Sequence, residues 1–499
     1  MKKLLEIVTN YEPVLRRSLI IIAIYILSAK IAVSNSVSFI DSDIWWHLRA
    51  GKWIFENQNL PTIDPFSTLG GAEWIAYSWL YELLQYFLFS IFGLPAFVIY
   101  TLAITLLVTW VLFSILQRAG SNIPLILALT PLGMLAMGGL LQNRSYLLSI
   151  LFFAVEMHVI CGAIKSNSAH RLFLLPFLFI IWANIHIQFI FGLFAYFMIM
   201  LNYFYGEMSF QRIENHNRKK NNKKAWIGIG IASVLATLVT PYHFFIYIHL
   251  AKIVHQTDYY KFIDELRPVQ FKGFNEWAFL FMVLLATFVM GWERKIRPFL
   301  FILFGIAAVI SFRAFRDVWF VVILGLIIIG DAFPAKGGPQ ALKTNKYLAV
   351  ISIAVGIFVM FGYYNVSNTT LQRNVRRNYP VQASDYIERN GFSGPIFSSF
   401  EWGGYLIWRL PDHKVSMDSR AYPYGEERFL KRLNVLNGKG NWYEDFDLQS
   451  AKAIILNPDL PLSGILRSDQ KYKLVYEDET SLVFIPHYKT HKENHAIIR

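Results

Sequence analysis

The sequence predicts a polytopic α-helical membrane protein with a small α/β domain at its C-terminal end. Three observations lead to this fold class. Of the 499 residues, 55% are hydrophobic and only 16% are charged, which is less charge than soluble proteins of this size carry. Apolar runs long enough to cross the hydrocarbon layer recur along residues 1–364. After residue 364 the runs become short and alternate with turn residues, which is typical of a soluble α/β domain.

The apolar runs define the elements of the first 364 residues, and we expect each of them to be helical. They fall near 18–35, 76–93, 95–116, 123–141, 146–164, 172–185, 188–206, 225–241, 276–292, 298–312, 317–333 and 347–364.

Basic segments between these runs predict the topology. They are Arg16 and Arg17, then 117–120, 165–171, 217–224, 293–297 and 336–346, and the positive-inside rule places them in the cytoplasm. This assignment requires one early run not to cross. The run 76–93 carries Glu82 and Gln85, so we expect it to lie against the outer face. The result is about eleven spans with the N-terminus inside. The alternative is that 76–93 crosses and another run does not.

Charge and cysteine content restrict the partners. The formal net charge is +13, but the basic residues gather in short loops, which indicates a lipid bilayer rather than a nucleic acid as the partner. The chain has one cysteine, Cys161, so it can form neither an intramolecular disulfide nor a cysteine-based metal site. We expect a multi-pass protein of the plasma (inner) membrane.

The topology divides the chain into residues 1–364, with a first outer loop at 36–94, and an extracytoplasmic domain at 365–499. In this domain we expect a helix that starts near Pro380 and ends at Gly391, and strands in 394–400, 413–420, 451–457, 472–478 and 481–487. The last two flank a turn at 479–480 and predict a hairpin. In "EWGGYLIW" (401–408) the glycines predict either a tight turn that exposes Trp402 and Tyr405 or a turn followed by a core strand.

The first outer loop opens with "DSDIWWHLRAGKWIF", in which Asp41 and Asp43 precede a predicted interfacial helix at 44–56. One interpretation is that the acids cap this helix. The other is that at least one of them is a catalytic group or a metal ligand, because carboxylates close to a bilayer are costly and are retained for function. Asp41 is better placed to cap, so Asp43 is the preferred catalytic base.

Further polar residues fall in the short outer turns. Arginines there either pair with nearby acids or bind a phosphate, whose geometry the guanidinium matches. These are Arg144, Arg267, Arg313 and Arg316. Other candidate substrate-site residues are His47, Trp46, Asn184, His186, Asp264 and Glu265. The histidines are either acid–base groups or structural hydrogen-bonding residues. Asp264 and Glu265 are either a second acidic element or a solvated pair.

Carboxylates and arginines on the outer side suggest group transfer from a donor that the membrane delivers. A polyprenyl-phosphate sugar fits, because its lipid lies among the spans and its phosphate meets arginine. A carboxylate would then deprotonate the acceptor hydroxyl.

The sequence resembles the bacterial GT-C superfamily of membrane glycosyltransferases. The residues that carry the resemblance are "DSDIWWHLRAGKWIFENQNLPTIDPFS" with "WIAYSWLYELLQYFLFSIFG", then "WANIHIQFIFGL", "YPVQASDYIERNGFSGPIF" and "EWGGYLIWRLPDHKVSMDSR". The superfamily includes the oligosaccharyltransferase catalytic subunit, protein O-mannosyltransferases and the lipid A aminoarabinose transferase.

The resemblance implies a lipid-phosphate sugar donor, an inverting transfer and an acidic D-x-D motif in the first outer loop, here Asp41 and Asp43. Some members use such acids with a divalent metal, Mg²⁺ or Mn²⁺, and others without one, so both forms stay open here. "EWGGY" departs from the W-W-D-x-G acceptor motif of oligosaccharyltransferases, and acceptor binding is not carried over to Trp402. The acceptor is a glycan, a lipid or a protein. Alternatives to the enzyme are a lipid or glycan transporter (flippase) and a scaffold subunit of a surface-glycan assembly.

Overall fold

The computed structural model describes residues 2–39, 41–70, 72–210, 223–255, 263–292, 297–334, 350, 354–420 and 422–487. The basic segments 217–222, 293–296 and 336–346 lie outside these residues. The chain forms two compact units. The helical bundle comprises residues 1–37, 91–250 and 260–367, and the sheet unit comprises 38–90, 251–259 and 368–499. The first outer loop of the sequence prediction therefore belongs largely to the same unit as the C-terminal domain.

The described residues of the helical bundle confirm that its apolar runs form helices, while 347–349 and 351–353 of the last run lie outside the described residues. Its α-helices are α1 (Lys2–Val37), α4 (Pro95–Ala119), α5 (Ile123–Ala136), α6 (Ser145–Ser166), α7 (Leu174–Ile185), α8 (Phe189–Phe210), α9 (Lys223–Ala236), α11 (Phe274–Trp292), α12 (Pro298–Arg313) and α13 (Val318–Ala332). The short helices η1 (Gly138–Leu140), η2 (Ala169–Phe173), η4 (Asp264–Leu266) and η5 (Phe315–Asp317) and the π-helix η6 (Phe358–Tyr363) lie between or after them. Helix α10 (Phe245–His255) spans the boundary between the units.

Four helices of the described chain are long and apolar enough to cross a membrane. They are Ser18–Val37, Pro95–Ala119, Ser145–Ser166 and Phe274–Trp292. Shorter apolar helices cover 123–136, 169–185, 189–205, 298–313 and 354–363, so the predicted number of about eleven spans exceeds what helix length alone supports. Large apolar side chains such as Trp292, Phe274 and Val309 are exposed on the bundle, as expected of a surface that faces lipid. The bundle is thus suited to a multi-pass membrane protein.

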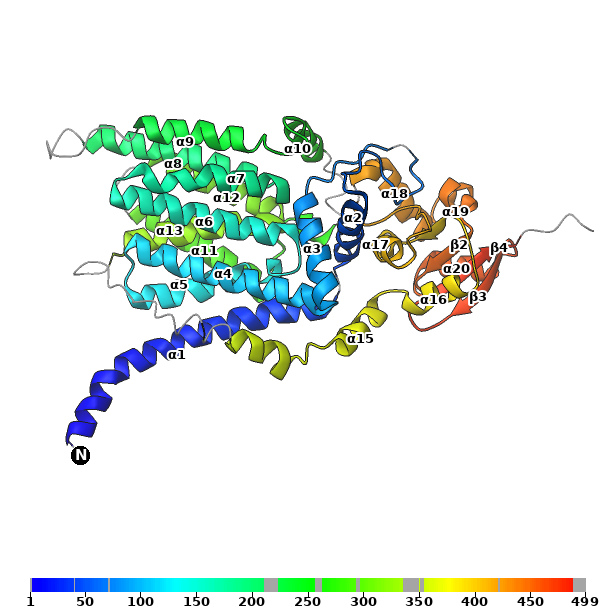
Figure 1. The fold of residues 1–499 in the computed structure, drawn as a ribbon, viewed down its shortest axis with the longest axis horizontal. Helices are drawn as coiled ribbons and strands as arrows, with labels where there is room; N and C mark the ends of the chain where they lie inside the picture. The colour runs from blue at the N-terminus through cyan, green and yellow to red at the C-terminus, as the bar shows by residue number, and fades with distance from the viewer. Residues whose placement is uncertain are drawn as a thin grey trace, which may run out of the picture. The chain divides into compact units, whose positions relative to one another are not determined.

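The helices of the bundle lie side by side and bring their connecting segments together in two groups (Figure 1). In one group, Asn35 donates to the carbonyl groups of Gly138 and Leu141 at 2.8 and 3.0 Å. The other group holds the residues 117–121, Lys165, Arg297 and 330–331, which contact one another through hydrogen bonds and an ion pair. Segments that the positive-inside rule assigns to one side of the membrane therefore meet in the structure.

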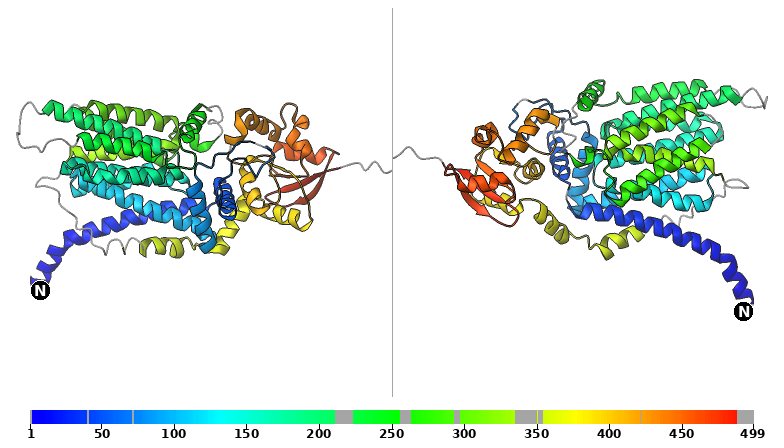
Figure 2. Two further views of the ribbon diagram at one scale, coloured as in Figure 1. Left: turned by 45° about the horizontal axis from the view of Figure 1, so that its top comes forward. Right: turned by 180° about the vertical axis from the view of Figure 1, so that it is seen from behind.

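The sheet unit contains a four-stranded mixed sheet in the order β1-β2-β4-β3. The strands are β1 (Ile396–Ser398), β2 (Ala453–Leu456), β3 (Tyr472–Glu477) and β4 (Leu482–Pro486). Strand β1 is parallel to β2, and the β3–β4 hairpin is antiparallel, with a turn at 478–481. Its helices are α2 (Asp43–Asn57), α3 (Trp79–Phe92), α15 (Asn368–Asn378), α16 (Val381–Arg389), α17 (Phe400–Arg409), α18 (Gly425–Leu436), α19 (Phe446–Ser450) and α20 (Pro461–Ser468). Helices α16 and α20 lie against β3 (Figure 2).

Most sequence predictions for this unit are confirmed. Helix α16 follows Pro380 and ends before Gly391, whose φ of 64° is left-handed, and four of the five predicted strands are present. The segment 413–420 is not a strand of the sheet; Val415 forms only isolated bridges to Ser67 and Ile396.

Both interpretations of residues 401–408 are wrong. The segment lies within helix α17, and Trp402 and Tyr405 are buried. The glycines permit close packing instead of a turn. A Cβ atom at Gly403 would lie 2.1 Å from the carbonyl oxygen of Met417, and one at Gly404 would lie 3.1 Å from that of Ser42. Helix α17 therefore packs closely against α2.

A buried ion network joins the segment 38–90 to the C-terminal part of the sheet unit. The guanidinium of Arg420 lies 2.9 Å from Asp64 Oδ1 and 2.6 Å from Asp418 Oδ2. The hydroxyl of Tyr424 donates to Asp418 at 2.8 Å, and Trp74 faces the guanidinium at 4.7 Å. All of the pair partners are almost fully buried, so this network holds Asp64 firmly against the C-terminal part.

Candidate functional sites

The two acids of the D-x-D motif lie at the start of α2. Asp41 Oδ1 accepts the backbone N–H of Asp43 at 3.0 Å, which favours the capping interpretation for Asp41, although the N-cap residue itself is Ser42 and its side chain makes no capping hydrogen bond. Asp43 is the first residue of the helix, where a negative charge is favourable for the helix dipole. The backbone carbonyl of Asp41 accepts a hydrogen bond from the hydroxyl of Tyr379 at 3.0 Å. The ring of Trp45 contacts Tyr379 and Tyr405 edge-on, and these contacts fix the start of α2 within the sheet unit.

The next turn of α2 contains an acid–base pair that sequence reasoning missed in part. His47 Nδ1 lies 3.5 Å from Glu82 Oε1 on α3, and both side chains are buried. The His47 ring contacts the Trp46 ring at an interplanar angle of 31° and meets Tyr81 edge-on. Glu82 did not enter the predicted site, since its partner comes from another helix and no local pattern reveals it.

Burial decides the charges of this pair. Desolvation lowers the pKa of His47 well below its ordinary value. Desolvation raises the pKa of Glu82 to about 8, against a smaller lowering effect of Arg420. At neutral pH the pair is therefore uncharged, with the proton on the carboxyl group. A group with a pKa near neutrality is suited to proton transfer, and buried pairs of this kind also occur for structural reasons.

The second site lies in the helical bundle, where two arginines from distant loops meet one carboxylate. Arg144 precedes α6, and its Nη2 lies 3.5 Å from Glu265 Oε2. Arg316 of η5 approaches the other oxygen, with 3.7 Å between its Nη1 and Glu265 Oε1. The three side chains are 16–24% exposed, so they are accessible to a ligand yet partly desolvated. Two guanidinium groups around one anion are the arrangement that binds phosphate.

Asp317 adjoins this arginine pair and is buried. Its Oδ1 accepts a hydrogen bond from Gln188 Nε2 at 2.6 Å, and its carbonyl accepts one from Ser311 at 2.9 Å. Desolvation raises the pKa of Asp317 to about 6, although Arg316, Gln188 and Arg313 favour the ionised form. Asp317 can therefore exchange a proton close to neutral pH.

The remaining predicted residues of the bundle are positioned as follows. Arg267 is half-buried, and its carbonyl accepts the N–H of Phe315, which links η4 to η5. Arg313 is exposed at the end of α12. Asp264 begins η4, and its side chain lies outside the described part of the structure.

Asn184 and His186 have structural partners, which favours the structural interpretation of both. Asn184 donates to the carbonyl groups of Ile180 and Val239, each at 2.8 Å, and so connects α7 to the chain after α9. His186 Nδ1 lies 3.0 Å from the hydroxyl of Ser149, which also accepts a hydrogen bond from the Trp182 indole at 2.9 Å.

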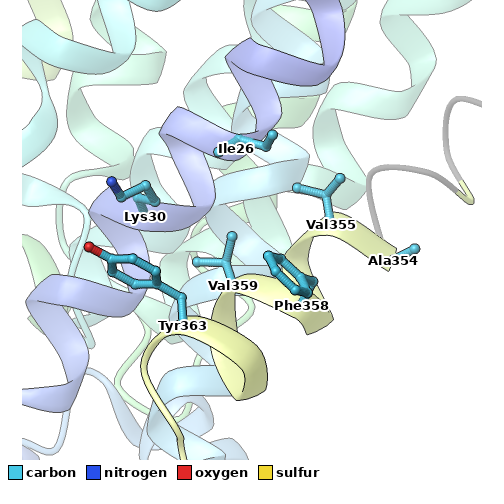
Figure 3. Close-up of a pocket in the computed structure, with 7 residues that line it drawn as sticks. All are labelled: Ile26, Lys30, Ala354, Val355, Phe358, Val359 and Tyr363. Atoms are coloured by element: carbon cyan, nitrogen blue, oxygen red, sulfur yellow. The ribbon is translucent and has the colours of Figure 1, made fainter. Parts of the chain in front are cut away.

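A hydrophobic cavity of about 390 Å³ lies between α1 and the segment around η6. Figure 3 shows its lining, in which Ile26 and Lys30 of α1 face apolar side chains that include Val355 and Phe358. The ammonium group of Lys30 lies 5.0 Å from the centre of the Tyr363 ring. The cavity thus combines an apolar wall with a cation at one edge, as a lipid with an anionic head group requires.

The structure divides the predicted site residues between the two units. It brings Arg144, Glu265 and Arg316 together with Asp317, and it places Asp41, Asp43, Trp46 and His47 in the sheet unit. Among the described residues, no three His, Cys, Asp or Glu side chains gather as a metal site would require, and the metal stays a prediction. The chain matches no protein-family model, and no curated protein sequence matches it.

Proposed function

We propose that the chain is a membrane glycosyltransferase that moves a sugar from a polyprenyl-phosphate donor to an extracytoplasmic acceptor. The observation that carries the proposal is the convergence of Arg144 and Arg316 on Glu265 at the ends of apolar helices. A lipid-linked phosphate is the anion that reaches such a place, because its chain lies in the bilayer and its head group lies at the surface.

In this proposal the bundle binds the donor. Arg144 and Arg316 hold the phosphate and stabilise the charge that develops on it as the sugar leaves. Arg267 lies on the segment of Glu265 and Arg313 lies on that of Arg316, and both add positive charge. The acids Asp264, Glu265 and Asp317 limit the net charge of these two segments. The cavity beside Lys30 is wide enough to hold part of an isoprenoid chain.

The reaction needs a base for the acceptor. Asp43, with Asp41 as the alternative, would remove the proton from the acceptor hydroxyl, whose oxygen attacks the anomeric carbon as the bond to phosphate breaks. Attack from the face opposite the phosphate inverts the anomeric configuration. A divalent Mg²⁺ or Mn²⁺ bound by the same two acids would help to neutralise the leaving phosphate. Among the bundle residues, Asp317 is a second base candidate, since its pKa lies close to neutrality.

The proposed topology has about eleven spans, a cytoplasmic N-terminus and an extracytoplasmic sheet unit, in a fold similar to that of the GT-C superfamily. It is supported by contacts among the segments assigned to the outer side. Asn35 contacts the chain before Arg144, Arg144 contacts Glu265, and Gln188 contacts Asp317. The short apolar helices would complete the crossing with their flanking turns or with locally thinned lipid.

A binding experiment tests the donor proposal. The purified chain in detergent is titrated with a polyprenyl phosphate and, separately, with the polyprenol that lacks the phosphate, while thermal stability is followed. We expect only the phosphate to stabilise the wild type strongly, and we expect the double variant Arg144→Gln, Arg316→Gln to lose this preference. The matched control is Arg467→Gln, which removes an exposed arginine of the sheet unit. Equal stabilisation of the wild type by both lipids would refute phosphate recognition.

Transport of a lipid or glycan is the second candidate function, and one observation favours it. Glu156 is fully buried in the middle of α6, one of the four long apolar helices. Ionisable residues inside the membrane commonly mark transport pathways. A scaffold role has no specific support from the described geometry, and it would be favoured by unchanged glycans after loss of both Asp41 and Asp43.

A further inference from the structure

Glu156 is a buried carboxyl group that the proposed transfer reaction does not use. It lies near the middle of α6 in the sequence "LFFAVEMHVI", and its side chain is fully buried. The surrounding helix is apolar enough to cross a membrane. An ionised carboxylate in such a place needs a counter-charge or several hydrogen bonds, because its desolvation is costly.

The structure provides no hydrogen bond for this carboxyl group. Across the described part of the chain, neither oxygen of Glu156 has a hydrogen-bond partner. The carboxyl group instead occupies a space that a glycine leaves open. A Cβ atom at Gly192 of α8 would lie 2.6 Å from Glu156 Oε2 and 2.6 Å from a ring carbon of Trp182 on α7. The absent side chain at position 192 is therefore a condition for seating Glu156 between α7 and α8.

The helices around α6 carry other charged or titratable groups, and these are engaged elsewhere. Tyr196 of α8 interacts electrostatically with Glu156, and its hydroxyl donates to the carbonyl of Trp226 at 2.8 Å. On α4, Arg118 donates to the carbonyl of His158 at 3.5 Å.

Two further charged groups lie near α6 on the C-terminal side of Glu156. Arg171 of η2 approaches α6 at Gly162, and Asp331 of α13 pairs with Arg297 at 2.8 Å. Arg171 at Gly162 and Asp331 near Cys161 lie closer to the C-terminal end of α6 than Glu156 does. The geometry thus places Glu156 where a neutral carboxyl group is favoured over an ionised one.

We propose that Glu156 is a proton-binding site inside the membrane bundle, and that it holds its proton at neutral pH. The ligand is a proton rather than a metal ion, because no cluster of metal-ligating side chains forms among the described residues. Release of the proton would require water or a cation to enter between α6 and α8. The inference goes beyond glycosyl transfer and does not depend on phosphate binding by Arg144 and Arg316.

Infrared spectroscopy tests the proposal directly. The full chain is reconstituted in lipid at pH 7, and the spectrum of Glu156→Gln is subtracted from that of the wild type. The subtraction removes the infrared bands of other buried acids, such as Glu82, which both proteins share. We expect a carbonyl stretch of a protonated carboxyl group in the difference spectrum, and its deuterium shift identifies it as an acid. Bands of an ionised carboxylate in its place would overturn the proposal.

A labelling experiment on the unmodified chain covers the case in which Glu156→Gln does not fold. Dicyclohexylcarbodiimide enters apolar regions and reacts with protonated carboxyl groups. The acid proton moves to a carbodiimide nitrogen, the carboxyl oxygen adds to the central carbon, and the acyl group then migrates to nitrogen without a leaving group. We expect a stable adduct at Glu156 at pH 7 by peptide mass spectrometry. An unmodified Glu156 in a sample whose Glu82 is modified would contradict the proposal.

The space that Gly192 leaves open for the Glu156 carboxyl group can be tested with a matched pair of variants. Gly192→Ala places a methyl group where the carboxyl group lies, so we expect labelling of Glu156 to change several-fold. Gly228→Ala on α9 is the control, because a Cβ atom there meets no atom within 4 Å. Equal labelling in both variants would show that Gly192 does not seat Glu156, and it would overturn the proposed geometry of the site.

Discussion

Replacement of Arg420 by methionine tests how the segment 38–90 is held in the sheet unit. Methionine fills a similar apolar volume but removes the charge. The wild-type guanidinium is 2% exposed and contacts two carboxylates, Asp64 and Asp418, which are 0% exposed. Without Arg420, two buried carboxylates lose their common counter-charge. The variant therefore removes one partner of a buried ion network and leaves the others in place.

The expected magnitude follows from this burial. Breaking a buried ion pair by removing one partner costs about 3–5 kcal/mol of stability. For a unit of this size, that loss lowers the thermal midpoint by roughly 6–20 °C. Burial alone would raise the pKa of Asp64, but Arg420 and Ser67 lower it below its ordinary value. Ionised Asp64 therefore stabilises the fold at neutral pH, and this stabilisation is lost as the pH falls and the carboxylate is protonated. In the variant, burial without Arg420 raises the pKa of Asp64. The difference in stability between the variant and the wild type should therefore be smaller in acid, where Asp64 is protonated.

The assay is thermal unfolding of the purified full chain in detergent at two pH values, followed by protease cleavage within the sheet unit. Arg467→Met is the matched control. Its guanidinium forms a 2.6 Å ion pair with Glu477, but the two side chains are 39% and 50% exposed, so the expected loss is about 0–1 kcal/mol. If Arg420→Met shifts the midpoint no more than the control does, then the network does not hold the segment and the reasoning is refuted.

Three further predictions use the same assay or a titration. The stability of the wild type relative to that of Glu82→Gln should fall by about 1.4 kcal/mol per pH unit as the pH rises from about 4.5 to about 8, and it should then level off, because Glu82 keeps its proton in the folded chain over this range. Gly403→Ala should destabilise by about 1–3 kcal/mol, since its Cβ would lie 2.1 Å from a backbone carbonyl, whereas Gly464→Ala in open space should not destabilise. Glu265→Gln should raise the affinity for inorganic phosphate by up to about tenfold in calorimetric titration, because the two arginines that Glu265 contacts lose their counter-charge. An unchanged affinity would argue against a phosphate site at these arginines.

The helices of the bundle could be predicted from the sequence because the length of an apolar run is a local property. Runs such as 95–116 and 146–164 became α4 and α6 with ends shifted by a few residues. The strands of the sheet unit were also found, since β-branched and aromatic residues between turns mark them locally. The prediction for residues 401–408 was wrong, because Gly403 allows the close contact of α17 with Met417, and no local sequence pattern reveals such a contact.

The candidate sites were predicted only in part for the same reason. Loop position was enough to select Arg144 and Arg316, and the structure then brought them to Glu265. Glu82 entered only the prediction of topology, and Glu156 entered no prediction, because each is a single acid in an apolar run. Their significance comes from burial against other helices, and the spacing of residues in one helix does not contain that information.

The most direct test of the proposed function is complementation of a strain that lacks the gene. Surface polysaccharide, glycolipid and protein glycans are compared after expression of the wild type, Asp41→Asn or Asp43→Asn, with equal amounts of each protein in the membrane. We expect the wild type to restore a missing sugar and Asp43→Asn to leave it missing, and the lost glycan then identifies the acceptor class. Full restoration by both variants would contradict the role of these acids as the base and would favour transport or a scaffold function.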